Sequence, residues 1–324
     1  MEDLREVPHN TGRSNSPEGY TAMREAAAVM DRPERSVLRL TGKDPVGMLN
    51  AILTNEVPKG GSRGVYAMLL NPKGRVQTDL RVVKAGEGIL IDTEPEGAEA
   101  AREILGRYAP FSRVKSEDLS GSWSVLGLYG PDARALLGGL EATEHASAEV
   151  EIGDLTLLAV GVTLPVPGYD LIGPADDLAA ARERLIELGA VLVGRRAYET
   201  ARIEAGIPRF GADITPENFP GETGTLDRAV SFQKGCYPGQ ETVARMRYRG
   251  HPNKVLHRLI IEDSEVQAGA QILQDVKTVG AVTSVAPLPV DGRVLALGYL
   301  SRGADTGGSL RSGNAGIRVL GATL

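Results

Sequence analysis

The chain has 324 residues, of which 42% are hydrophobic and 24% are charged, a balance typical of a globular protein with two or three folding units. Its net charge of −6 argues against a general nucleic-acid binder, because phosphate neutralisation needs clustered Lys and Arg. The single cysteine, Cys236, excludes an internal disulfide and a self-contained cysteine-rich metal or iron–sulfur site.

The amino-terminal stretch, residues 1–19, is polar, contains acids and lacks an apolar core. We therefore expect a flexible leader and neither a signal peptide nor a transit peptide. No apolar run reaches the length of about 18 residues that a membrane-spanning helix needs. These features predict a soluble, cytoplasmic protein that works without a membrane.

The first half of the chain indicates a mixed α+β unit. Residues 20–31 are rich in Ala, Met and Glu and predict a helix that stops before Pro33. Residues 36–41 predict a strand that feeds a second helix, with Asp44 as its N-cap. A meander of three antiparallel strands and a further helix are expected next: 65–70, 75–84, 88–93 and 95–108.

A partial internal repeat indicates a second, related unit. The sequence LTGKD at 40–44 has a counterpart, LYGPD, at 128–132, and each precedes an expected helix. From Lys254 onward, short strand-like segments broken by Gly predict a small β-barrel, with 301–316 as a flexible loop between its last two strands. We expect lobes at 20–120, 121–250 and 251–324.

The most specific segment is KGCYPGQE, at 234–241, which precedes Arg245, Arg247 and Arg249. Its glycines allow backbone conformations that a Cβ would block. Positive charge from Lys234 and the arginines would stabilise the Cys236 thiolate and make it reactive. The alternative is a buried, inert cysteine beside a solvated cationic surface.

KGCYPGQE resembles the signature of the YgfZ family of folate-binding proteins, which are related to the aminomethyltransferase of glycine cleavage. The segment 202–217, and Thr54-Asn55 after the first glycine turn, resemble other parts of the same superfamily. The resemblance runs from about Ser36 to the carboxyl end. It implies a three-lobed cloverleaf, two related α+β lobes plus a C-terminal β-barrel, with tetrahydrofolate or a one-carbon derivative in a central channel.

The resemblance also implies a set of site residues. Glu204 is the candidate anchor for the pterin ring, because a carboxylate accepts two bonds from its N–H edge; the alternative is a surface acid paired with Arg202. Tyr198 and Arg202 share a helix face and are expected to line the channel. The other candidates are Asn55, Tyr237, Gln240 and Arg245 for folate, with Cys236 and Lys234 for the chemistry.

One position departs from the aminomethyltransferase pattern. Adjacent aspartates are expected in the strand after the glycine turn, whereas this chain has Thr78-Asp79. The alignment places Thr78 at the catalytic acid, and a threonine supplies no carboxylate; a shift of one residue brings Asp79 into the catalytic role. The histidines, His9, His145, His251 and His257, have no ligand spacing, so no metal site is expected.

The resemblance implies a tetrahydrofolate-binding protein that assists iron–sulfur cluster synthesis or repair in client enzymes, including radical enzymes that modify tRNA. Its expected partners are folate and iron–sulfur client proteins, with no direct contact to nucleic acid, and a monomer is the default. One alternative is a folate-dependent aminomethyltransferase or demethylase acting on a small amine, which a carboxylate near the folate amine would mark. Another is a folate-sensing scaffold.

Overall fold

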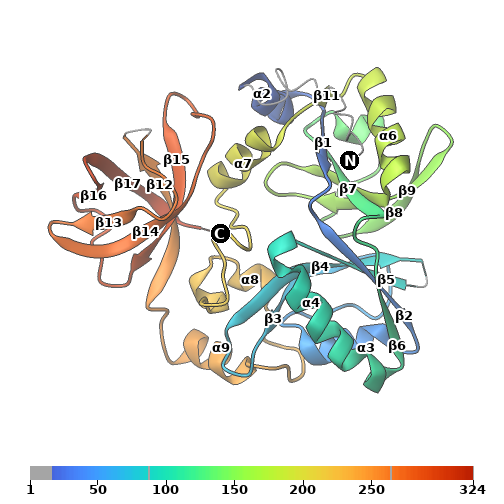
Figure 1. Cartoon of the computed structure of the whole chain (residues 1–324), viewed down its shortest axis with the longest axis horizontal. Coiled ribbons are helices and arrows are strands. Elements are labelled where there is room, and N and C mark those ends of the chain that lie inside the picture. The colour runs from blue at the N-terminus through green and yellow to red at the C-terminus, as the bar shows by residue number, and fades with distance from the viewer. Residues whose placement is uncertain (1–16, 87, 263–264, 324) are drawn as a thin grey trace, which may run out of the picture.

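A computed structural model describes residues 17–86, 88–262 and 265–323 of the chain. These residues form three lobes, two of them built on β-sheets and the third a barrel that lies to one side (Figure 1). The predicted α+β fold with a C-terminal β-barrel is therefore confirmed. Within the described ranges, no helix is long and apolar enough to cross a membrane.

The first lobe is an antiparallel sheet in the order β3-β4-β5-β2-β6. Its strands are β2 (Ser36–Gly42), β3 (Val65–Leu70), β4 (Val76–Ala85), β5 (Gly88–Thr93) and β6 (Val114–Asp118). The helices of this lobe are α3 (Pro45–Ile52), α4 (Pro95–Tyr108) and the 3₁₀ turn η1 (Ala109–Ser112). The predicted meander and both helices are confirmed.

Local sequence accounts for these helices. The Asp44 side chain accepts a hydrogen bond from the N–H of Gly47 at 2.8 Å and so caps α3. In α4, the buried residues Ala98, Ala101 and Leu105 recur at helical spacing and face the sheet. One apolar stripe thus fixes α4 against the first sheet.

The second lobe is a sheet in the order β11-β1-β7-β10-β9-β8. Its strands are β1 (Ala28–Arg32), β7 (Trp123–Tyr129), β8 (Ser147–Ile152), β9 (Leu155–Val162), β10 (Gly168–Pro174) and β11 (Val191–Leu192). Its helices are α2 (Pro17–Glu25), α5 (Ala133–Leu136) and α6 (Ala175–Glu187). The α6 helix packs its buried residues against this sheet.

The beginning of the chain differs from the prediction. The predicted helix over 20–31 is wrong in its second half, because α2 ends at Glu25 and residues 28–32 form strand β1. The strand lies between β7 and β11, where Ala28, Val29 and Met30 are all buried. Burial on both sides outweighs the helix propensity of Ala and Met. The structure therefore places α2 and β1 in the second lobe, whereas the sequence predicted them in the first. Of the predicted leader, residues 1–16 lie outside the described residues.

The two sheets pack face to face. A buried cluster joins them, with Val37, Val83 and Leu90 from the first sheet against Val125, Val160 and Ile172 from the second. Four helical elements follow the second lobe in the chain: α7 (Arg195–Glu204), η2 (Pro220–Glu222), α8 (Leu226–Ala229) and α9 (Gln240–Tyr248). In Figure 1, α7 and α8 lie between the barrel and the two sheets.

The C-terminal lobe is a closed barrel in the order β12-β15-β14-β13-β16-β17. Its strands are β12 (Lys254–Ile261), β13 (Gln271–Gln274), β14 (Lys277–Val285), β15 (Val294–Ser301), β16 (Leu310–Ser312) and β17 (Ala315–Ala322). The expected loop over 301–316 is wrong in part, because β16 lies inside it and pairs with β13 and β17. The buried side chains of Leu310 and Ser312 explain why this segment is ordered as a strand.

Candidate functional site

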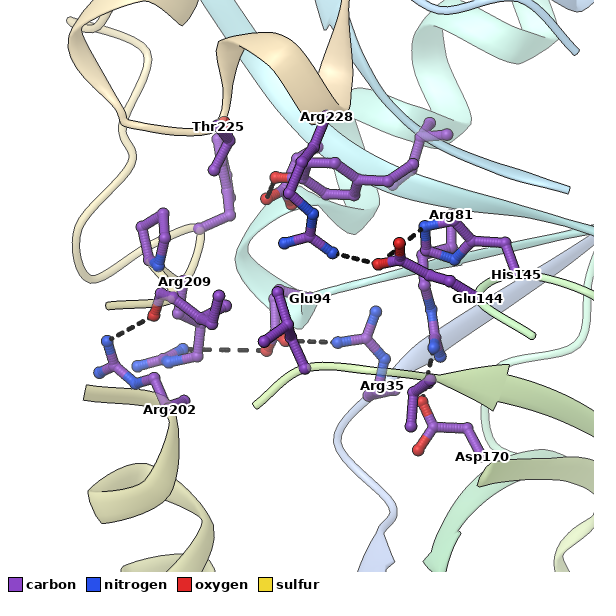
Figure 2. Close-up of a pocket in the computed structure, with 18 of the residues that line it drawn as sticks. Arg35, Arg81, Glu94, Glu144, His145, Asp170, Arg202, Arg209, Thr225 and Arg228 are labelled. Atoms are coloured by element: carbon purple, nitrogen blue, oxygen red, sulfur yellow. Dashed lines mark hydrogen bonds and ion pairs between the residues drawn. The ribbon is translucent and has the colours of Figure 1, made fainter. Parts of the chain in front are cut away.

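The candidate site is a pocket with a cavity volume of about 120 Å³, formed by both sheets and by α7 and α8. A cavity of this size has room for several water-sized groups. We call it the inner pocket; Figure 2 shows its wall. Ten charged side chains, six arginines and four acids, line it: Arg32, Arg35, Arg81, Arg202, Arg209, Arg228, Asp79, Glu94, Glu144 and Asp170.

Strand β4 decides which acid enters the pocket. Side chains two apart on a strand share a face, so Asp79 and Arg81 both line the pocket, whereas Thr78 faces the other way. The Thr78 side chain lies on the side of the sheet that α4 covers, and its hydroxyl contacts the hydroxyl of Thr93 on β5 at 3.1 Å. The alignment that puts Thr78 at the position of the catalytic acid therefore does not fit the geometry. The alignment shifted by one residue, which puts Asp79 there, does fit.

Asp79 has the surroundings of a general acid–base group. The Tyr66 hydroxyl donates a hydrogen bond to its Oδ2 at 2.6 Å. Burial raises the pKa of Asp79 from 3.8 to about 6, and the Tyr66 hydrogen bond limits the rise. A carboxyl group with a pKa near the working pH both accepts and donates a proton readily, which is what a general acid–base group requires.

A buried ion network joins the two sheets beside Asp79. Arg81 bonds Asp92 of the first sheet through Nε at 2.7 Å and lies 2.6 Å from Asp170 of the second sheet through Nη1. Arg35 adds ion pairs to Asp92 and Glu94. Burial alone would raise the pKa of Asp92, but these guanidinium groups hold it well below its usual range.

The ion pairs around the pocket differ in how firmly they are held. Asp92 and Asp170 are at most 2% exposed, and removing one partner of such a pair costs about 3–5 kcal/mol. Arg228 and Glu144 lie 2.5 Å apart with side chains 27% and 28% exposed, and a pair of this kind contributes about 1 kcal/mol or less. The buried network is therefore a fixed scaffold, and the Arg228–Glu144 pair is easily opened.

Among the residues that the structure describes, four buried polar atoms of the pocket wall have no hydrogen-bond partner. They are Arg32 Nε, Glu94 Oε2, His145 Nδ1 and Arg209 Nε. Buried polar groups are normally satisfied, because each unsatisfied one costs about 1–3 kcal/mol. A planar ligand rich in donors and acceptors fits this wall, since it would supply the missing partners.

His145 has a special position in this wall. It adopts a left-handed backbone conformation (φ 62°) in the turn before β8. Burial, with the charge of Arg81, lowers its pKa to about 4. The imidazole is therefore neutral at physiological pH and lies in the pocket wall.

The structure brings some of the predicted site residues together. Tyr198, Arg202 and Asp79 all line the inner pocket. The Tyr198 ring lies under the Arg32 guanidinium, 4.6 Å from its carbon, and Arg202 is fixed by Asp213 and Glu199 at 2.6 and 2.7 Å. The expectation that Tyr198 and Arg202 share a face toward the channel agrees with this geometry.

Glu204 lies elsewhere. Its carboxylate accepts a hydrogen bond from the Tyr20 hydroxyl of α2 and pairs with Arg24 at 3.4 Å, with its side chain 34% exposed. It is not part of the inner pocket wall described here. Glu204 therefore joins α7 to α2, whereas Glu94 lies in the pocket wall, where its Oε2 accepts no hydrogen bond from a described residue and lies 3.9 Å from Nη1 of Arg209.

The remaining folate candidates also lie outside the inner pocket. Asn55 donates to the carbonyl oxygens of Tyr66 and Arg228, both at 2.9 Å, and so holds α8 against the first sheet. Tyr237 is buried in an apolar cluster. Gln240 begins α9, and Arg245 is exposed on that helix.

The signature loop does not place its thiol in the pocket. Cys236 is exposed and is absent from the pocket wall, contrary to the hypothesis that it faces the channel. Lys234 turns inward and donates to the carbonyl oxygens of Asn50, at 2.9 Å, and Leu53 at the end of α3. Burial lowers its pKa to about 8. Lys234 thus caps a helix end.

Sequence reasoning missed most of the charged wall. One signal was present, because charged residues inside otherwise apolar strands are rarely buried without a partner. Asp92 follows Ile89, Leu90 and Ile91, and Asp170 lies in a strand that is buried along nearly its whole length. Among the described residues, no group of three or more His, Cys, Asp or Glu could hold a metal ion.

The chain is similar to known proteins over most of its length. Residues 12–234, more than half of the chain, match the family described as GCVT N-terminal domain. The aminomethyltransferase of Moorella thermoacetica is 27% identical over 311 residues, covering 90% of this chain and 84% of that protein. The crystal structure of glycine cleavage system aminomethyltransferase T from Bartonella henselae has a TM-score of 0.82 at 22% identity, covering 93% of this chain and 87% of that one.

These similarities correct one prediction and confirm others. Assistance in iron–sulfur cluster synthesis or repair is contradicted, because the relatives point to aminomethyl transfer, the alternative carried by the sequence. The fold is confirmed as that of the T protein. Tetrahydrofolate is confirmed as the cofactor, since aminomethyltransferases of this family use it. The chain belongs to the GCVT N-terminal domain family.

Proposed function

We propose that this chain is a folate-dependent aminomethyltransferase, which moves a one-carbon unit between a small amine-bearing donor and tetrahydrofolate in the inner pocket. The observation that carries the proposal is Asp79, a buried carboxyl group that lines the pocket with a pKa of about 6. A carboxylate at the folate amine is the mark expected of such an enzyme. The similarity to an aminomethyltransferase over 90% of the chain supports the same reading.

The wall of the pocket suits the cofactor. Tetrahydrofolate supplies the amine nitrogen that carries the one-carbon unit. Glu94 Oε2 offers an acceptor for an amino group on the pterin edge, and Arg32 Nε and Arg209 Nε offer donors. These three groups would orient the ring, because each gains a hydrogen bond that it lacks in the protein alone.

Asp79 would manage the proton of the reaction. With a pKa of about 6 it is largely ionised at pH 7 and accepts a proton, yet it returns that proton at little cost. The hydrogen bond from Tyr66 to Oδ2 fixes the orientation of the carboxyl group. The buried pairs of Arg81 hold β4 against the second sheet and thereby keep Asp79 in place.

The finer resemblance to YgfZ-type proteins stays a prediction within the family. It rests on KGCYPGQE, which forms the approach to α9 and part of its first turn. The cytoplasmic location, the monomeric state and the lack of a nucleic-acid partner likewise stay predictions. None of them bears on the chemistry proposed for the inner pocket.

The proposal is tested in the reverse direction. The protein would be incubated anaerobically with 5,10-methylenetetrahydrofolate, ammonia and a small thiol, and the release of tetrahydrofolate followed by mass spectrometry. We expect release above the protein-free rate, a loss of at least about 100-fold in Asp79→Asn, and a rate within about twofold of wild type in Cys236→Ser, because Cys236 lies outside the pocket. If Asp79→Asn released tetrahydrofolate at the wild-type rate, Asp79 would not be the acid–base group.

The expected loss must be separated from unfolding. Asparagine keeps the acceptor for the Tyr66 hydroxyl, so the pocket should retain its shape. Binding of tetrahydrofolate to Asp79→Asn within about tenfold of wild type would show that the loss lies in the proton transfer. An inactive wild-type protein that binds no tetrahydrofolate would contradict the proposed function itself.

A further inference from the structure

A second pocket adjoins the inner one. We call it the outer pocket; it lies over the edge of the first sheet, α8 and the turn before β8, and Asn55, Arg63 and Asp227 are among its lining residues. Four residues line both pockets: Tyr66, Glu144, His145 and Arg228. These four therefore form the partition between the inner and the outer pocket.

The partition is closed by one ion pair. Arg228 donates from Nη2 to Glu144 Oε1 at 2.5 Å, and its guanidinium carbon lies 5.8 Å from the centre of the Tyr66 ring. Figure 2 shows Arg228 and Glu144 reaching toward each other from opposite sides of the pocket. Because both side chains are partly exposed, this pair exchanges partners more easily than the buried pairs of Arg81.

The backbone is anchored on both sides of the pair. Arg228 lies on α8, and its carbonyl oxygen accepts a hydrogen bond from Asn55, so its backbone is tied to the first sheet. Glu144 lies in a turn, next to His145, whose N–H donates to the Gly161 carbonyl oxygen at 2.8 Å and whose own carbonyl oxygen accepts from Gly64 at 2.7 Å. A change of partner at this pair therefore involves the two side chains and leaves the backbone in place.

Glu144 also keeps a negative charge at this position. Burial alone would raise the pKa of Glu144, but the Arg228 guanidinium outweighs burial, and the pKa lies below its ordinary value. A carboxylate thus already occupies the place beside Arg228 where a carboxylate of a ligand would bind. The neutral His145 at 3.6 Å from Glu144 offers no competing cation.

We propose that the Arg228–Glu144 pair is a selective gate, in which Arg228 binds a carboxylate of the incoming ligand and Glu144 is the internal counter-ion that this carboxylate displaces. The ligand would enter through the outer pocket, whose lining holds Arg63 together with the acids Glu56 and Asp227, the latter paired with Arg247 at 2.7 Å. A ligand without a carboxylate gains nothing from displacing Glu144, so the gate favours anionic ligands. This inference rests on the proposed function, because it assigns the ligand to the same pocket.

A ligand carboxylate has two sources here, the glutamate tail of the folate and the carboxylate of a small amine. Binding calorimetry under anaerobic conditions separates them with two matched pairs of probes. The cofactor pair is tetrahydrofolate and 6-methyltetrahydropterin, which lacks the carboxylates. The amine pair is N-methylglycine and N-methylethanolamine, which keeps the amine and lacks the carboxylate; both serve only as binding probes.

The variants are Glu144→Gln and Arg228→Met. In the pair whose carboxylate uses the gate, we expect the carboxylate probe to bind about fivefold more tightly to Glu144→Gln and about tenfold more weakly to Arg228→Met, with its carboxylate-free partner unchanged. Arg182→Met is the matched control, because Arg182 and Asp31 form an ion pair of similar exposure that lies outside both pockets. It should change no affinity.

The outcomes are distinguishable. A gate effect in one probe pair supports the proposal and identifies the source of the carboxylate. The gate is overturned if neither variant changes the affinity of either carboxylate probe, or if both variants change affinity equally with and without carboxylates; pterin binding to wild type then leaves the proposed function standing. Carboxylate selectivity confined to the amine pair, with no pterin binding in wild type, supports the gate and contradicts the proposed function; no binding of any probe contradicts both.

Discussion

Replacing Asp79 with asparagine tests whether this carboxyl group titrates near neutral pH. Burial raises its pKa from 3.8 to about 6, so between these values the folded state holds a proton that the unfolded chain has released. The stability of the protein therefore falls as the pH rises through this window. A difference of about 2 pKa units corresponds to about 3 kcal/mol in total, of which about 1.4 kcal/mol falls between pH 5 and pH 8.

Asparagine does not titrate, so the variant should lack this fall. We expect the free energy of unfolding of Asp79→Asn, relative to wild type, to rise by about 1.4 kcal/mol between pH 5 and pH 8. Urea unfolding at several pH values measures the difference, and Asp154→Asn, at an exposed turn, controls for the loss of one carboxylate. A relative stability that is independent of pH, or that falls as pH rises, would refute the raised pKa.

Two further substitutions test the scaffold that positions Asp79. Arg81→Met should lower the free energy of unfolding by about 3–5 kcal/mol, because Asp92 and Asp170 each lose a buried partner; a loss below about 1 kcal/mol in urea unfolding would contradict the network. Gly97→Ala should cost about 1–3 kcal/mol, because its Cβ would lie 1.9 Å from the Thr78 hydroxyl. Adding Thr78→Ala should recover part of that loss, and an equal loss in the double variant would argue against this contact.

Local sequence predicted the elements whose signals are short-range. The Asp44 cap and the Pro95 start of α4 depend on neighbours a few residues away, and both are found. Strand β1 was missed because its identity depends on β7, about a hundred residues later in the chain. Propensity alone favoured a helix at Ala28–Met30.

The site was harder to predict than the fold for the same reason. No sequence pattern singles out Arg32 and Arg35. Only the packing of the two sheets brings them to Glu94 and Asp170. The one-residue ambiguity between Thr78 and Asp79 could not be settled from the sequence, because a slip of one position reverses the face of a strand. The signature at 234–241 drew attention to Cys236, but the structure places that thiol outside the pocket.

Anaerobic calorimetry of tetrahydrofolate with wild type, Arg209→Met and Glu204→Ala tests whether tetrahydrofolate binds in the inner pocket. Arg209 lines the pocket, where its Nε donates no hydrogen bond to a described residue and lies 3.7 Å from Glu199, whereas Glu204 lies outside the pocket beside Tyr20 and Arg24. We expect binding to wild type, affinity lowered about tenfold or more in Arg209→Met, and affinity within about twofold of wild type in Glu204→Ala. Loss of binding in Glu204→Ala with Arg209→Met unaffected, or no binding to wild type, would show that tetrahydrofolate does not bind there.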